Sequence, residues 1–167
     1  AGWFMNSKVR NDSAVGINPY SFDWTAIARK FDNKKDKVLC GDYSNFDGSL
    51  RASYLKTIGS CIISWYGYKG GDFVVASYLW AQVYNSLHVN RDRVYRWDQG
   101  LPSGHPLTTV INSIYNLASI AYAYDRCCDK RSIPKIPKGH YVAIVYGDDN
   151  VVGFNSRFWY EGLEQDW

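Results

Sequence analysis

The sequence predicts a mixed α/β domain in which an antiparallel β-hairpin is backed by helices. Three stretches place apolar residues at the three- and four-residue spacing of amphipathic helices, over residues 49–66, 73–87 and 105–125. An apolar run, Tyr141–Tyr146, is followed by a polar turn and a second apolar run that ends at Phe154, which is typical of a hairpin. These observations favour an antiparallel sheet with helices packed on it.

The remaining elements follow in order along the chain. Residues 1–20 predict a loop with short extended pieces, residues 22–31 a short helix, and residues 33–37 a polar, basic loop. Residues 38–43 read as a buried strand, and glycines after residue 66 end the first long helix.

A second hairpin is predicted in the middle of the chain. Apolar and polar residues alternate over residues 87–97 around a polar turn. A Gly/Pro/Ser loop over residues 99–104 leads into the long helix, with Pro106 in its first turn and an apolar face that includes Ile114 and Tyr122. Residues 126–138 then predict a basic, proline-containing loop.

Composition bounds the class of protein. The 167 residues suit one domain, and 46% hydrophobic with 21% charged residues excludes a disordered chain. A net charge of +3 is too mild to identify a nucleic-acid binder. The four cysteines lack metal-binding spacing and predict free thiols in a reducing compartment, and no apolar run approaches the ~18 residues of a membrane span.

Three motifs carry candidate chemistry. Asp148 and Asp149 follow Gly147 at the tip of an apolar hairpin, where adjacent like charges call for a compensating cation such as Mg²⁺; an exposed turn is the simpler alternative. Asp42 ends the first strand, and Asp47 follows five residues later, where a helix cap is the alternative for Asp47.

The third motif is the loop that contains Ser103 and Gly104 and the helix that follows it. Such a loop can offer backbone N–H groups to an anion, and Thr108 and Asn112 lie one helical turn apart. The alternative is a capped helix with two solvent-facing polar residues.

In this order the three motifs resemble motifs A, B and C of picornavirus-like RNA-directed RNA polymerases. The matching strings are Asp42-x4-Asp47, Ser103-Gly104-x3-Thr108-x3-Asn112 and Tyr146-Gly147-Asp148-Asp149, and residues 15–19 resemble the stretch upstream of motif A. The resemblance implies a polymerase palm over residues 1–167, with about 66–99 at the junction with the fingers.

The resemblance also implies roles for these residues. Asp42 and Asp148, assisted by Asp149 and the Tyr43 carbonyl, would hold two Mg²⁺ ions, with Mn²⁺ as a substitute, so the Asp42 and Asp148 carboxylates are expected to lie within reach of one cation. The ribose-recognition set is Asp47, Ser103, Thr108 and Asn112, with Gly104 as a flexible neighbour.

Implied partners are an RNA template and primer, ribonucleoside triphosphates, the polymerase's fingers and thumb, and other viral replication proteins at membrane-associated sites in the host cytoplasm. The family's basic fingers motif and thumb have no counterpart here, and no lysine follows Lys138. We therefore expect a fragment of a longer enzyme that does not polymerise RNA alone. Alternatives are a reverse transcriptase palm, an inactive palm-fold remnant and a simple cation-binding domain.

Overall fold

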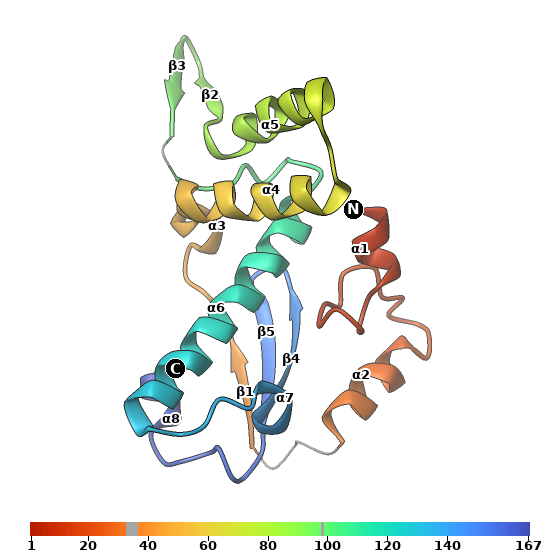
Figure 1. Cartoon of the computed structure of the whole chain (residues 1–167), viewed down its shortest axis with the longest axis vertical. Helices are drawn as coiled ribbons and strands as arrows, with labels where there is room; N and C mark the ends of the chain where they lie inside the picture. The colour runs from red at the N-terminus through yellow and green to blue at the C-terminus, as the bar shows by residue number, and fades with distance from the viewer. Residues whose placement is uncertain (33–36, 98) are drawn as a thin grey trace. The chain divides into compact units, whose positions relative to one another are not determined.

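The computed structural model describes residues 1–32, 37–97 and 99–167. The chain divides into two compact units, which we describe separately (Figure 1). The first unit contains residues 1–43 and 112–167, and the second contains residues 44–111. The predicted basic loop at residues 33–37 falls mostly on residues outside the described part of the chain.

An antiparallel sheet of three strands organises the first unit. Its strands are β1 (Lys37–Gly41), β4 (Tyr141–Tyr146) and β5 (Asp149–Phe154), in the order β1-β5-β4. The predicted hairpin is confirmed, because β4 pairs with β5 from Tyr141↔Phe154 to Tyr146↔Asp149. Beyond β4, the Ala14 N–H donates to the Val145 carbonyl at 2.8 Å, so an N-terminal segment extends the sheet by one bridge.

Both faces of β4 are covered, which explains its nearly continuous apolar sequence. Ala143 and Val145 pack into a cluster with side chains of helix α6 (Thr108–Arg131), which lies along one side of the sheet in Figure 1. Ile144 points the other way and packs with Ile27 of helix α2 (Asp23–Phe31). Successive side chains of β4 therefore pack into two different hydrophobic clusters, one on each face of the sheet.

Short helices complete the first unit. They are α1 (Gly2–Asn6), α7 (Pro137–His140) and α8 (Leu163–Asp166). An ion pair between Lys30 and Asp12 ties α2 to the segment beside β4. At the end of α6, the Arg131 guanidinium lies 3.9 Å from the ring centre of Tyr160, a cation–π contact with the segment that follows β5.

The second unit is largely helical. It contains α3 (Phe46–Ser49), α4 (Ala52–Tyr66), α5 (Gly70–Tyr84) and the hairpin of β2 (Leu87–Asn90) and β3 (Arg93–Arg96). Helices α4 and α5 pack closely, and the Trp80 indole N–H donates to the Leu55 carbonyl at 2.8 Å. The loop after β3 returns to α3, because the Leu101 N–H donates to the Asp47 carbonyl at 3.0 Å.

The long helix differs from its prediction in its length and in which of its residues are buried. It ends at Arg131, not Asp125, because Tyr124, Cys127 and Cys128 are buried against the sheet and continue its inner face. The predicted apolar face is only partly right. Val110 and Ile111 on this face are buried, but Tyr122 is 63% exposed, and Asn112 on the predicted polar face is buried. The helix begins after Pro106, which precedes its first turn.

Other elements also differ in part. Residues 1–20 contain α1 where a loop was predicted, and α5 begins and ends three residues earlier than predicted. The first strand ends at Gly41 and is not buried: β1 pairs on one side only, and Val38 is 46% exposed. All four cysteines are free, and no helix among the described residues is long and apolar enough to cross a membrane.

The contact between α4 and α5 yields a stability prediction. A Cβ atom on Gly59 would lie 1.9 Å from Nε1 of the buried Trp80, so Gly59→Ala must push the two helices apart. We expect a loss of about 1–3 kcal/mol in the free energy of unfolding, measured by urea denaturation. Gly71→Ala on α5 is the matched control, because nothing lies within 4 Å of its Cβ. Equal midpoints for the two variants would contradict this packing.

Candidate active site

The tip of the β4–β5 hairpin carries two adjacent carboxylates. Gly147 and Asp148 form the turn, and Asp149 begins β5. Gly147 has φ +63°, a left-handed conformation that glycine adopts without steric cost. Asp148 is half-buried and Asp149 is exposed, so both side chains reach the surface at the end of a strand pair whose inner residues are buried.

The pairing of β1 with β5 brings a third carboxylate to this tip. Gly41 lies opposite Asn150 in the last pair of the ladder. Asp42, which follows Gly41, and Asp149, which precedes Asn150, therefore lie side by side just beyond that pair. Asp42 and Asp149 line the same cavity of about 410 Å³, together with Tyr146. Two carboxylates that are 107 residues apart in sequence are therefore brought together within the first unit.

These side chains have the chemistry of a hard-cation site. Carboxylate and carbonyl oxygens are the donors that Mg²⁺ takes in proteins, and it commonly keeps waters or substrate phosphates as further ligands. Among the described residues, no lysine or arginine forms an ion pair with Asp42, Asp148 or Asp149. No three His, Cys, Asp or Glu side chains in the described part of the chain form a ready-made metal cluster. The donors fit a cation that also uses external ligands.

Two buried side chains of α6 hold the backbone of the turn. The Ser113 hydroxyl accepts the Gly147 N–H at 2.9 Å. The Asn116 side-chain amide lies 3.1, 2.7 and 3.2 Å from the carbonyl oxygens of Gly147, Asp148 and Asp149. Both side chains are fully buried. The polar groups of the turn are therefore satisfied by the helix beneath it.

Tyr43 connects the end of the first strand to the same amide. Its hydroxyl donates to Asn116 Oδ1 at 3.4 Å. Burial of that hydroxyl, with a smaller contribution from Tyr115, raises the pKa of Tyr43 above its ordinary value. The hydroxyl therefore stays protonated at neutral pH and remains a donor.

Sequence reasoning missed Ser113 and Asn116 as functional candidates. A signal was present, because Thr108, Asn112 and Asn116 are spaced four residues apart and share one helical face. Polar residues repeated at helical spacing resemble a solvent-facing stripe, and only the hairpin above the helix explains why this stripe is buried.

The residues expected to read the ribose are divided between the two units. In the second unit, the Ser103 hydroxyl donates to Asp47 Oδ2 at 3.3 Å, which joins motifs A and B. Thr108 shares its hydroxyl proton between the carbonyls of Pro102 (2.7 Å) and His105 (2.8 Å). Asn112 is buried and belongs to the first unit, so its pairing with Asp47 stays a prediction.

Two simpler interpretations of these residues are wrong. Asp47 does not cap a helix, because it lies inside α3, whose N-cap is Asn45. Asn112 does not face solvent, since only 5% of it is exposed. Gly104 is exposed and has open space around it. In its loop, the N–H groups of His105 and Thr108 are already donated internally, so neither is available to an anion.

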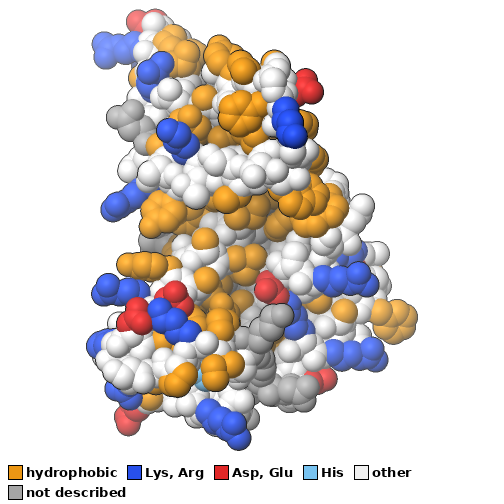
Figure 2. Space-filling view, in the orientation of Figure 1, with side chains coloured by type: hydrophobic (Ala, Val, Ile, Leu, Met, Phe, Trp, Pro, Cys, Tyr) orange, Lys and Arg blue, Asp and Glu red, His pale blue; other side chains and the backbone are white. Residues whose placement is uncertain are grey.

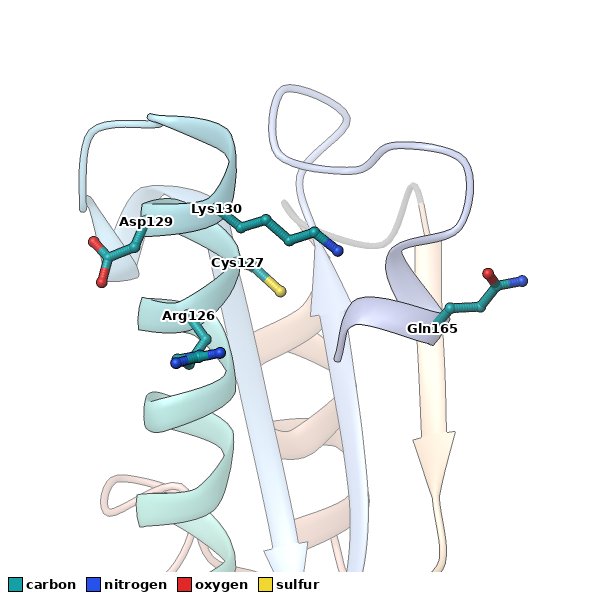
Figure 3. A pocket seen from close by; sticks show the side chains of 5 residues that line it. All are labelled: Arg126, Cys127, Asp129, Lys130 and Gln165. Carbon is teal, nitrogen blue, oxygen red and sulfur yellow. The ribbon is translucent and has the colours of Figure 1, made fainter.

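A second cavity of about 410 Å³ lies between the end of α6 and α8 (Figure 3). Its lining residues are Arg126, Cys127, Asp129, Lys130 and Gln165. The Lys130 side chain reaches across the gap from α6, while the Asp129 carboxylate points away from it. None of the residues predicted to carry chemistry lines this cavity.

Comparison with known proteins decides the family. The family described as viral RNA-dependent RNA polymerase matches residues 3–165. The chain belongs to this family. The expected likeness to picornavirus-like polymerases is thereby confirmed.

Two individual relatives support this family assignment. The chain is 34% identical over 171 residues to the replicase polyprotein of Drosophila C virus (strain EB), covering 94% of this chain and 10% of the polyprotein. It is 35% identical over 161 residues to the RNA1 polyprotein of Broad bean wilt virus 2, covering 93% of this chain and 9% of the polyprotein. The chain thus spans about a tenth of these relatives.

A solved structure shares the fold. The Sicinivirus 3Dpol RNA dependent RNA polymerase aligns with a TM-score of 0.69 and 25% sequence identity, over 88% of this chain and 30% of that one. The mixed α/β fold with antiparallel sheets is therefore that of part of a viral polymerase.

The site yields a stability prediction. Ser113→Ala removes the acceptor of the buried Gly147 N–H, which should cost about 1–3 kcal/mol of unfolding free energy. Thermal unfolding and exchange of the Gly147 amide proton would measure the loss. Ser119→Ala is the control, because its hydroxyl bonds only within α6, to the Tyr115 carbonyl. Unchanged exchange at Gly147 in the first variant would contradict the assigned bond.

Proposed function

We propose that this chain is the catalytic palm of a viral RNA-directed RNA polymerase, which transfers ribonucleotides from triphosphates to an RNA 3′-end under the direction of a template. The observation that carries the proposal is the neighbouring position of Asp42 and Asp149 at the end of the β1–β5 ladder, beside the Gly147–Asp148 turn. Membership of the polymerase family supports assigning these carboxylates to nucleotidyl transfer.

Asp42, Asp148 and Asp149, with the Tyr43 carbonyl, are the residues that would hold two Mg²⁺ ions, for which Mn²⁺ can substitute. Such ions supply stabilisation of the attacking and leaving oxygens in phosphoryl transfer. The protein's own contribution is to present acceptor oxygens from two strands on a fixed turn. The hydrogen bonds to Ser113 and Asn116 support this rigidity.

Asp47, Ser103, Gly104, Thr108 and Asn112 are the residues that we propose bind the nucleotide. The bond from Ser103 to Asp47 supports a pre-arranged pocket, because it orients a carboxylate whose two oxygens together offer about four acceptor positions. A polar group that expects a 2′-hydroxyl discriminates against a deoxyribose that leaves it unsatisfied. This chemistry favours ribonucleotides over deoxyribonucleotides.

The chain acts within a longer polymerase, in this proposal, with fingers and a thumb, an RNA template and primer, and other viral replication proteins at membrane-associated sites in the host cytoplasm. Residues of about 66–99 lie at the junction with the fingers. Helix α5 supports this assignment, because Figure 2 shows hydrophobic side chains gathered where Figure 1 places it. Tyr78 is 68% exposed and Val74 64%. The chain alone, 30% of the solved relative, is expected to be inactive.

The proposed metal role is tested by Asp148→Asn in the complete polymerase. A neutral amide cannot replace a charged ligand of Mg²⁺, so we expect single-nucleotide addition to fall at least about 1000-fold, equivalent to roughly 4 kcal/mol, with unchanged thermal unfolding. Asp92→Asn makes the same chemical change in the exposed β2–β3 turn and should keep normal activity. Near-normal addition by Asp148→Asn would remove Asp148 from the metal site.

The proposed sugar reading is tested by Asn112→Ala in the complete polymerase. If Asn112 orients Asp47 toward the ribose, its loss should reduce the preference for ATP over dATP by an amount equivalent to about 1–3 kcal/mol. Competition between ATP and dATP on a defined RNA template measures the ratio. An unchanged ratio would exclude Asn112 from this role, and a wild-type preference for dATP would favour a reverse transcriptase.

A further inference from the structure

One buried amide contacts both segments that supply the proposed catalytic carboxylates. Asn116 Nδ2 lies within 3.2 Å of three successive carbonyls, those of Gly147, Asp148 and Asp149. On its other side, Oδ1 accepts the hydroxyl of Tyr43, the residue that follows Asp42. Asn116 itself is fully buried and carries no charge.

From this arrangement we infer that Asn116 is a positioning residue, which sets the affinity of the site for its divalent cations without touching them. The inference rests on the proposed function. It assigns a role in metal affinity to a side chain that lies beneath the turn, outside the set of carboxylates.

The physical reason begins with the peptide plane. Each peptide unit is rigid, so fixing the direction of a carbonyl restricts the dihedral angles on both sides of it. When three successive carbonyls converge on one amide group, the Cα–Cβ directions of Asp148 and Asp149 are restricted as well. An NH₂ group has two hydrogens, so three acceptors must share them, and the shortest contact, 2.7 Å, is to Asp148.

Repulsion between the carboxylates explains why this restraint favours cation binding. Adjacent ionised carboxylates repel each other, and the described residues offer Asp42, Asp148 and Asp149 no ion-pair partner. A free turn would relax by moving its carboxylates apart, and a cation would then have to restore the binding geometry. A turn already held by Asn116 and Ser113 avoids this reorganisation. Partners outside the ligand shell commonly change metal affinity by about 10- to 100-fold.

The bond from Tyr43 extends the restraint to the third carboxylate. Asp42 follows the last ladder pair of β1, where no further strand pairing holds the backbone. The Tyr43 hydroxyl anchors the next residue to Asn116, so the positions of Asp42 and of the hairpin turn depend on the same side chain. Tyr43→Phe removes this hydrogen bond and leaves the three carbonyl contacts of Asn116 and the backbone carbonyl of residue 43 intact.

The test is Mn²⁺ binding to the complete polymerase, followed by electron paramagnetic resonance of the free ion and therefore independent of catalysis. Asn116→Ala should weaken binding about 10-fold or more. Tyr43→Phe should weaken it by a smaller factor, on the order of 2- to 5-fold, because the three carbonyl contacts remain. Ser119→Ala, one turn along α6, is the matched control and should bind as the wild type does.

A second measurement separates positioning from a purely structural role. The Mg²⁺ concentration for half-maximal nucleotide addition should rise in Asn116→Ala by the same factor as the Mn²⁺ dissociation constant, and saturating Mg²⁺ should restore much of the rate. A folded Asn116→Ala enzyme that binds Mn²⁺ within 2-fold of the wild type overturns the inference. If Asn116→Ala does not fold, Tyr43→Phe is the deciding variant. Mn²⁺ binding by Tyr43→Phe that equals that of the wild type also overturns the inference. A wild-type enzyme without templated addition would instead refute the proposed function.

Discussion

The register between β1 and β5 is the constraint on which the candidate active site depends. With Gly41 opposite Asn150, the residue after β1 lies beside the first residue of β5, so Asp42 meets Asp149. Side chains alternate between the two faces of a strand, so a slip of one residue would place Gly41 or Tyr43 at that point and turn Asp42 to the other face. No carboxylate pair would then form.

Burial on β5 fixes this register. β5 is the central strand, and Val152 and Phe154 are fully buried within the cluster that α6 covers. Shifting β5 by one residue would turn both side chains away from this cluster and put Val151 and Gly153, which fill less space, in their place. β1 contributes little to this selection, since Val38 and Cys40 are exposed, so the position of Asp42 depends on the hydrogen-bonded ladder and on the anchor at Tyr43.

The sequence predicts the hairpin and its acidic tip well, because an apolar run bounded by Gly147 leaves few alternatives to a turn. It predicts α6 as a helix but mistakes part of its buried face. Periodicity places Asn112 on the polar face and gives no role to Asn116, and both are buried; the Asn116 amide bonds to carbonyls that belong to another segment. No pattern within the helix can reveal an acceptor 31 to 33 residues away.

The predicted end of α6 at Asp125 is wrong for a similar reason, because contacts with other segments extend the helix to Arg131. Residues 126–131 are rich in charge, which favours a loop when they are considered alone. Yet Cys127 and Cys128 are each only 1% exposed, and the Arg131 side chain covers the ring of Tyr160. The helix continues to Arg131 because two small buried residues in this turn are enough to hold it against the sheet, while the charged side chains beside them reach solvent.

Polar residues beneath the turn also have an energetic consequence for the site. An apolar side chain in place of Asn116 would fill the space but leave the carbonyls of the turn without their donor, in a location closed to water. The turn would respond by tilting those carbonyls toward solvent, on the side where the carboxylates lie. A buried amide is therefore the means by which one helix both satisfies the backbone of the hairpin and keeps its acidic side chains together against their mutual repulsion.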